Sequence, residues 1–243
     1  MEARDVPGVV GVPEHGMAAD PAIRAAATVV LLRRGRDGPR VLMGLRGKGA
    51  VFMPSKMVFP GGAVDSGDAE VPIDIDAALD AALREQSAGP SPAALGAAAV
   101  RELWEETGLR LSVPGDWTDA PAAWRGFAAG GHRPAAPFRF VFRAVTPPGR
   151  PRRFDARFLL ADAGAIAGDP DDFSRAGDEL SHLEWVPLAE ARSRDIPFVT
   201  EVALAEIARI AAGEPRPHVP FLDNGAEESL FRQMRGHAPG AAD

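Results

Sequence analysis

The chain has 243 residues, enough for one main domain with additional segments, and 46% of them are hydrophobic, enough for a buried core. Its formal charge of −7 argues against nonspecific binding to nucleic acid, and the absence of cysteine excludes disulfides and thiolate zinc sites. No apolar run is long enough to span a bilayer and no signal-peptide pattern begins the chain, so we expect a cytoplasmic protein without a membrane partner.

The beginning of the chain predicts an arm and then a β-hairpin. Residues 1–21 are rich in Pro, Gly and small side chains, which is typical of a flexible arm. Residues 23–33 form an apolar run typical of a buried strand, and residues 40–45 predict its partner across a glycine-containing turn. We expect the main domain at 22–213 and a C-terminal tail at 214–243.

A glycine turn follows the next short apolar segment, which ends at Pro60. Because Gly61 and Gly62 have no Cβ, a backbone carbonyl at this turn can point toward a ligand. The loop before the turn carries positive charge at Arg46 and Lys48. These side chains either face a phosphate group or belong to an ordinary solvated loop.

The next predicted helix presents carboxylates on one face. Ser91 can cap its first turn, and Gly108 can end it in a left-handed conformation. Glu102, Glu105 and Glu106 stand at positions i, i+3 and i+4, so their side chains share a face. Two such charges about 6 Å apart repel by roughly 3 kcal/mol at an effective dielectric constant near 20, and Mg²⁺ or Mn²⁺ would offset that repulsion. The alternative is a solvated charged face without a metal.

Beyond this helix we expect a loop, two strands and a final helix. Residues 111–136 are loop-like, and their aromatic side chains are expected as packing anchors: Trp117, Trp124 and Phe127. Residues 138–146 and 152–161 predict two strands, and residues 198–212 predict an amphipathic helix. The arginines around the turn between the two strands are either phosphate contacts or plain surface residues. We select three of them as candidate substrate contacts: Arg150, Arg152 and Arg153.

Two separate parts of the sequence resemble the signature of the Nudix hydrolases, which runs Gly, five residues, Glu, seven residues and then Arg-Glu-apolar-x-Glu-Glu-x-Gly-apolar. Residues 101–109 match the second half throughout, and Gly62 matches the start, with Asp68 in place of the usual Glu. Gly62 and Arg101 are 39 positions apart, about 25 more than in the family pattern. Residues 69–91 are therefore predicted to be an insertion, which either shapes the substrate cleft or is a surface excursion without function.

The resemblance implies an α/β/α sandwich around a mixed β-sheet, carrying a hydrolase that uses Mg²⁺ or Mn²⁺ to cleave diphosphate linkages. By the same resemblance, Glu105 and Glu106 hold the metal, helped by Glu102 and by the carbonyl of Gly61. The metal would polarise phosphoryl oxygens and acidify the attacking water.

The remaining roles are also carried over from the family. The general base is Glu102 or, as the second choice, Glu179, which precedes Trp185 by six positions as an acidic residue does in relatives. Arg101 is expected to orient the glutamates through an ion pair. Arg46 joins the three arginines named above as a candidate substrate contact.

The substrate depends on segments outside the signature. The Phe-Pro-Gly-Gly turn, the long insertion and residues 52–54 resemble the peroxisomal coenzyme A diphosphatases and their bacterial relatives, which implies coenzyme A or an acyl ester of it. NADH, nucleotide sugars and dinucleotide polyphosphates are alternatives, as is a Nudix module that binds a nucleotide without hydrolysing it. The sequence leaves the oligomeric state open, a homodimer included.

Overall fold

The computed structural model describes residues 21–85, 87–226 and 228–235, so the predicted arm at 1–21 falls almost wholly outside it. The elements of the described ranges, in chain order, are β1 (Ile23–Arg33), β2 (Arg40–Arg46), β3 (Met57–Val58), β4 (Gly61–Ala63), η1 (Ser66–Glu70), α1 (Ala77–Arg84), α2 (Pro92–Thr107), β5 (Arg110–Pro114), η2 (Ala122–Trp124), α3 (Arg125–Ala128), β6 (His132–Pro134), β7 (Arg139–Val145), β8 (Arg153–Asp162), η3 (Ala163–Ala165), β9 (Ile166–Ala167), β10 (Leu180–Pro187), α4 (Leu188–Ala191), α5 (Phe198–Ala211), β11 (Val219–Asp223) and β12 (Leu230–Met234).

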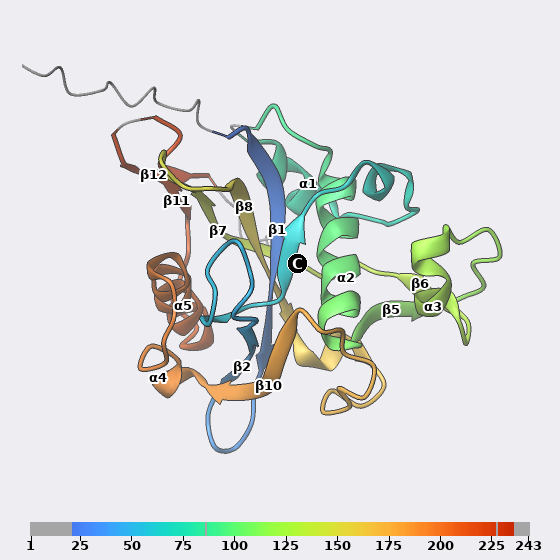
Figure 1. Ribbon diagram of the computed structural model, residues 1–243. Coiled ribbons are helices and arrows are strands. Elements are labelled where there is room, and N and C mark those ends of the chain that lie inside the picture. Colours follow the sequence, from blue (N-terminus) through green and yellow to red (C-terminus); the bar gives the residue numbers. More distant parts are fainter. Residues whose placement is uncertain (1–20, 86, 227, 236–243) are drawn as a thin grey trace, which may run out of the picture.

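A large mixed sheet lies between two helical layers. Within the described residues, nine strands form this sheet in the order β10-β2-β1-β8-β7-β11-β12, with β3 paired to β2 and β4 paired to β1. Helices α1 and α2 cover one face, and α4 and α5 cover the other (Figure 1). The predicted α/β/α sandwich around a mixed sheet is therefore confirmed. No helix in the described part of the chain is long and apolar enough to cross a bilayer.

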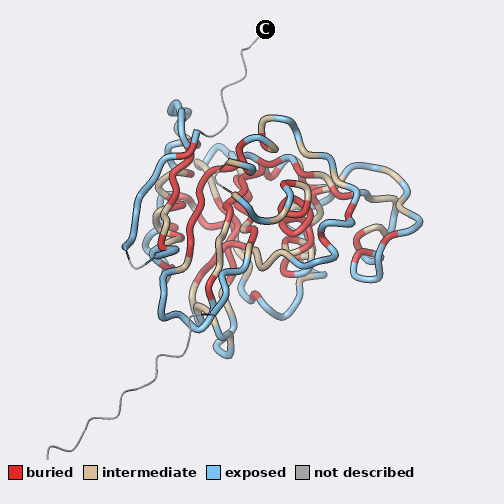
Figure 2. Tube along the Cα trace, turned by 90° about the horizontal axis from the view of Figure 1, so that it is seen from above, coloured by how far each residue is buried: buried red, intermediate tan, exposed pale blue. Residues whose placement is uncertain are grey.

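The sheet is organised around β1. This strand pairs in parallel with β8 from Ile23 to Leu32, and its other edge is shared by β4 and β2. Its side chains alternate between the layers, since Val29 and Leu31 pack on the α2 side while Val30 and Leu32 pack on the α5 side. Because helices cover both faces of the sheet at β1, the side chains on both sides of this strand are apolar, which accounts for the continuous apolar run in its sequence. Figure 2 shows the buried residues gathered in these central elements.

Residues 69–91, the predicted insertion, pack into the molecule. Leu79 and Leu83 of α1 are buried in the same apolar cluster as α2. Just before α1, Ile75 packs so closely on α2 that a Cβ at Gly96 would lie 2.7 Å from its Cδ1 atom. The segment thus belongs to the helical layer beside α2 and is not a surface excursion.

Two regions contain strands that the sequence did not predict. Residues 111–136, expected to be a loop, contain most of β5 and all of β6, which form a second sheet with β9. The expected aromatic anchors pack here, with 5.2 Å between the ring centroids of Trp124 and Phe127. Residues 219–234, placed in a tail by the sequence, contain β11 and β12 of the main sheet. These strands have three to five residues each, too few for an alternating pattern to stand out.

Candidate active site

The C-terminal half of α2 brings three carboxylates to the glycine turn at β4. Ser91 caps the helix by accepting a hydrogen bond of 3.2 Å from an N–H of the first turn, and Gly108 ends it with φ 75°. Both caps agree with the sequence analysis, and packing of the apolar face of α2, Leu103 included, on the sheet sets the rotation of the helix about its axis. Glu102, Glu105 and Glu106 consequently project from one side of α2, toward the turn.

Gly61 and Gly62 allow the backbone of β4 to lie directly against these carboxylates. The Gly61 N–H donates a hydrogen bond of 2.8 Å to Glu106 Oε2. A Cβ at Gly61 would lie 2.4 Å from the carbonyl oxygen of Ala27, and a Cβ at Gly62 would lie 2.5 Å from the carboxylate of Glu102. The close approach therefore requires glycine at position 61, where the obstacle is backbone, whereas a Cβ at position 62 would displace the Glu102 carboxylate. The contact of Gly61 is made by its amide, and the metal-binding role of its carbonyl stays a prediction.

Arg101 joins the glycine turn to the carboxylates. Its Nε and Nη2 atoms donate to the two oxygens of Asp68 at 2.8 and 2.9 Å, and Asp68 is only 2% exposed. Its Nη1 atom donates to Glu102 at 2.7 Å and to Glu105 at 3.2 Å, while Nη2 also donates to the carbonyl of Ala63. This geometry agrees with the predicted role of Arg101 in orienting the glutamates. It also shows that Asp68 reaches Arg101 despite its shorter side chain.

Burial shapes the electrostatics of the glutamates. Desolvation raises the pKa of Glu106 to about 8, although the hydrogen bond from Gly61 and the charge of Arg46 oppose the shift. Burial also raises the pKa of Glu102, against the opposing charge and hydrogen bond of Arg101. The Oε1 atom of Glu106 is buried and has no hydrogen-bond partner among the described residues. An additional positive charge at this position would therefore stabilise the ionised glutamates.

Arg46 and Glu179 complete the cluster from the opposite side. Arg46 ends β2, and its Nη1 and Nη2 atoms lie 3.9 Å from Glu106 Oε1 and from Glu179 Oε2. Glu179 directly precedes β10, where Leu180 pairs with Arg46. The structure thus brings together Glu102, Glu106, Glu179 and Arg46 from three distant parts of the sequence. Glu184, the next acidic residue along β10, instead pairs with Arg194 at 3.3 Å.

The donor set suits a hard divalent cation, because it consists of carboxylate oxygens and one of them, Glu106 Oε1, is buried without a hydrogen bond from the described part of the chain. Nevertheless, no three acidic, His or Cys side chains of the described residues are arranged to hold one ion. In this arrangement Glu102 and Glu105 accept hydrogen bonds from Arg101, and Glu106 accepts one from Gly61.

The other candidate arginines do not join this cluster. Arg150 and Arg152 are exposed in and beside the turn before β8. Arg153 is buried, and its guanidinium donates to the carbonyls of Thr146, Asn224 and Gly225. Along β1, Arg153 pairs with Ile23, whereas Gly61 pairs with Thr28. These two positions of β1 are five residues apart, so Arg153 and Gly61 are separated by about 17 Å along the strand. Substrate contact by these three arginines stays a prediction that the cluster geometry does not favour.

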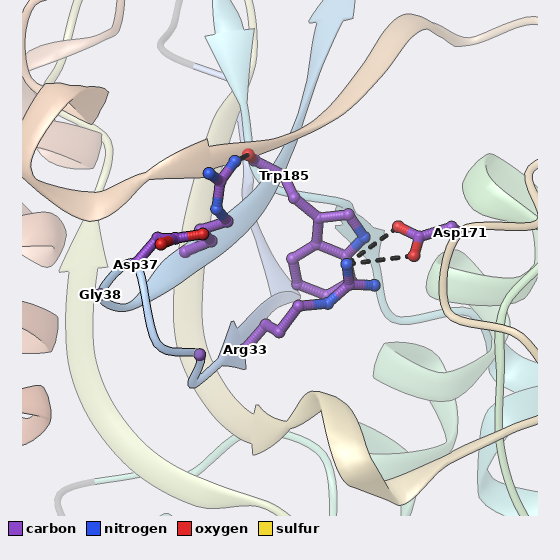
Figure 3. A pocket seen from close by; sticks show the side chains of 7 residues that line it. Arg33, Asp37, Gly38, Asp171 and Trp185 are labelled. Atoms are coloured by element: carbon purple, nitrogen blue, oxygen red, sulfur yellow. Dashed lines mark hydrogen bonds and ion pairs between the residues drawn. The ribbon is translucent and has the colours of Figure 1, made fainter.

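A pocket of about 460 Å³ lies at the β1–β2 hairpin, away from the glutamates of α2 (Figure 3). Arg33 packs over the ring of Trp185 at 4.0 Å from its centroid, and its Nη1 atom pairs with Asp171 at 2.9 Å. The loop that carries Asp171 continues to Glu179 and contacts α2 through Gly177, whose N–H donates to the Glu105 carbonyl. The sequence analysis missed Gly177, because a Gly-Asp pair signals a turn and gives no hint of a helix contact.

Comparison with known proteins gives two informative similarities. The chain is 38% identical over 94 residues to the Caenorhabditis elegans protein named "Putative nudix hydrolase 7", which covers 39% of this chain and 24% of that protein. The chain therefore spans about a quarter of that relative's length. It is also 30% identical to the crystal structure of a NUDIX hydrolase from Alicyclobacillus acidocaldarius, covering 79% of this chain and 93% of that chain with a TM-score of 0.56. No family model matches the chain.

Proposed function

Because the chain belongs to the Nudix hydrolase family, we propose that it is a metal-dependent pyrophosphohydrolase that cleaves a diphosphate linkage in a nucleoside diphosphate derivative. The observation that carries the proposal is the buried Oε1 atom of Glu106, which lies beside Glu102 and Glu179 and has no hydrogen-bond partner among the described residues. A buried carboxylate oxygen without a partner costs free energy, which a bound cation would relieve. We therefore propose Mg²⁺ or Mn²⁺ as the cofactor.

We assign the residues as follows. Glu105 and Glu106 hold the metal, with Glu102 and the carbonyl of Gly61 as further ligands. When bound, the metal polarises phosphoryl oxygens and lowers the pKa of water. Arg101 orients Glu102 and Glu105 through the hydrogen bonds that it donates to them.

The proton of the attacking water is accepted by Glu102, or by Glu179 as the second choice. Glu102 is favoured because its carboxylate packs against Gly62 and is held by Arg101, so its position is defined. Arg46 contacts phosphate oxygens of the substrate, since its guanidinium lies at the carboxylate cluster and can offer several donors.

Coenzyme A or an acyl ester of it is the substrate that we propose to test first, from the resemblance of the turn and the inserted segment to coenzyme A diphosphatases. NADH, nucleotide sugars and dinucleotide polyphosphates are the alternatives. A module that only binds a nucleotide is less favoured, because Asp68, the residue that departs from the family pattern, still forms a two-fold hydrogen bond with Arg101.

The test is hydrolysis of a panel containing coenzyme A, acetyl-coenzyme A, NADH, ADP-ribose and diadenosine polyphosphates, each with Mg²⁺ or Mn²⁺. Loss of a metal ligand removes several kcal/mol of transition-state stabilisation, so Glu105→Gln should reduce kcat by about 100-fold or more. Glu190→Gln, an exposed change in α4, is the matched control and should leave kcat unchanged. Absence of turnover, together with a ligand that raises the melting temperature, would favour the binding module.

A further inference from the structure

The loop at residues 168–179 joins β9 to β10 and carries Glu179 at its end. In Figure 1 this loop runs beneath the C-terminal end of α2. It is attached to the rest of the molecule near its beginning and at Gly177, and the carbonyl of Glu179 itself accepts a hydrogen bond of 3.4 Å from the Gly47 N–H.

The attachment near Glu179 is made by Gly177. Its N–H donates a hydrogen bond of 2.9 Å to the carbonyl of Glu105, in the last turn of α2. Carbonyls in this turn have no partner within their own helix, so the loop supplies one. A Cβ at Gly177 would lie 2.5 Å from that same carbonyl oxygen, a distance at which the backbone would have to move. Only glycine therefore allows the loop to dock this closely.

The other attachment is at the pocket of Figure 3. The Trp185 Nε1 atom donates to the carbonyl of Pro170 at 3.1 Å, and Asp171 pairs with Arg33 at 2.9 Å. These contacts hold the beginning of the loop to the sheet. With both ends held, the backbone of Glu179 has little freedom to shift.

The side chain of Glu179 has little support of its own. It is 71% exposed, and the contact described for its carboxylate is Arg46 at 3.9 Å. Its position beside the α2 carboxylates is therefore set by the backbone, which Gly177 holds against α2 on one side and the pairing of β10 with β2 holds on the other. Arg46 shows that this position is close to α2, because its guanidinium lies 3.9 Å from Glu179 Oε2 and 3.9 Å from Glu106 Oε1.

We propose that Gly177 is a positioning residue, which places Glu179 beside the metal-binding carboxylates by docking its loop against the Glu105 carbonyl. The inference rests on the proposed function, because it assumes that the α2 carboxylates bind a divalent cation. It adds a residue outside the signature to those on which the cation site depends.

A double-mutant cycle separates this role from a merely structural one. The proteins are the wild type, Gly177→Ala, Glu179→Gln and the double variant, and the readouts are the Mn²⁺ dissociation constant by calorimetry and kcat on the substrate that the panel identifies. Each single change should weaken Mn²⁺ binding by about 10-fold, as expected for a group that supports metal ligands. The double variant should bind Mn²⁺ no more weakly than whichever single variant has the higher Mn²⁺ dissociation constant. Gly35→Ala adds the same methyl group where its nearest neighbour is 3.9 Å away, and should change nothing.

Equal effects of Gly177→Ala with and without Glu179 would overturn the proposal, as would normal Mn²⁺ binding by either single variant. If Gly177→Ala does not fold, Asp171→Asn is used instead, because it weakens the exposed ion pair with Arg33 at the other attachment. Asp171→Asn should weaken Mn²⁺ binding less than Gly177→Ala would, and this loss should be absent in the Glu179→Gln protein. If the wild type hydrolyses nothing, the proposed activity fails, whereas the Mn²⁺ cycle still decides the role of Gly177.

Discussion

Replacement of Asp68 by alanine should destabilise the protein strongly even without substrate or metal. Asp68 is 2% exposed, and its two oxygens accept hydrogen bonds of 2.8 and 2.9 Å from Arg101. Removing one partner of a buried ion pair costs about 3–5 kcal/mol, because the remaining charge is left buried. Arg101 keeps Glu102 and the carbonyl of Ala63, so we expect the lower end, about 3 kcal/mol. For a domain of this size, that corresponds to a decrease of about 6–12 °C in melting temperature.

The assay is urea and thermal unfolding in EDTA, so that no metal contributes to stability. Asp65→Asn is the control in the same turn, because Asp65 is 62% exposed and lies 3.9 Å from Arg101. An exposed ion pair contributes about 1 kcal/mol or less, so the control should be nearly as stable as the wild type. A loss below about 1 kcal/mol for Asp68→Ala, equal to that of the control, would refute the reasoning that the buried pair holds Arg101 in place.

Three further changes separate stability from activity. Leu95→Ala, at a fully buried position of α2, should lower the free energy of unfolding by about 2–5 kcal/mol in urea, whereas exposed Leu230→Ala should change it little. Arg46→Gln should lower kcat/KM by about 10-fold or more through lost phosphate contacts, yet strengthen Mn²⁺ binding measured by calorimetry because a nearby positive charge is removed. Arg153→Ala should lower the melting temperature without changing KM, since its guanidinium binds backbone carbonyls; a raised KM with unchanged stability would restore its predicted substrate contact.

Features determined by neighbouring residues were predictable from the sequence. Ser91 and Gly108 are local helix signals, and α2 begins and ends beside them. The shared face of Glu102, Glu105 and Glu106 follows from helical spacing alone. The boundaries of β1 agreed for a similar reason, because a strand covered on both faces needs a continuous apolar run.

Features determined by distant parts of the chain were not predictable. Arg153 is a residue type that commonly contacts phosphate. Its burial depends on Asn224 and Gly225, which follow β11 and lie more than 70 positions away in the sequence. The contact of Gly177 with α2 likewise depends on where a loop docks. Glu179 was located because its spacing from Trp185 resembles that of the family, and spacing from one strand does not show which residue holds the loop.

The ion pair between Asp68 and Arg101 closes a loop in which the two residues are 33 positions apart, where the family pattern has about eight. Closing a flexible loop costs entropy that grows only with the logarithm of its length, so the longer loop adds about 1 kcal/mol. Burial of Leu79 and Leu83 by the same segment contributes about 1.5–3 kcal/mol each toward holding it against α2. The two halves of the signature therefore need to contact each other in the folded protein but need not be close in the sequence. The segment between them can vary in length as long as it packs beside α2.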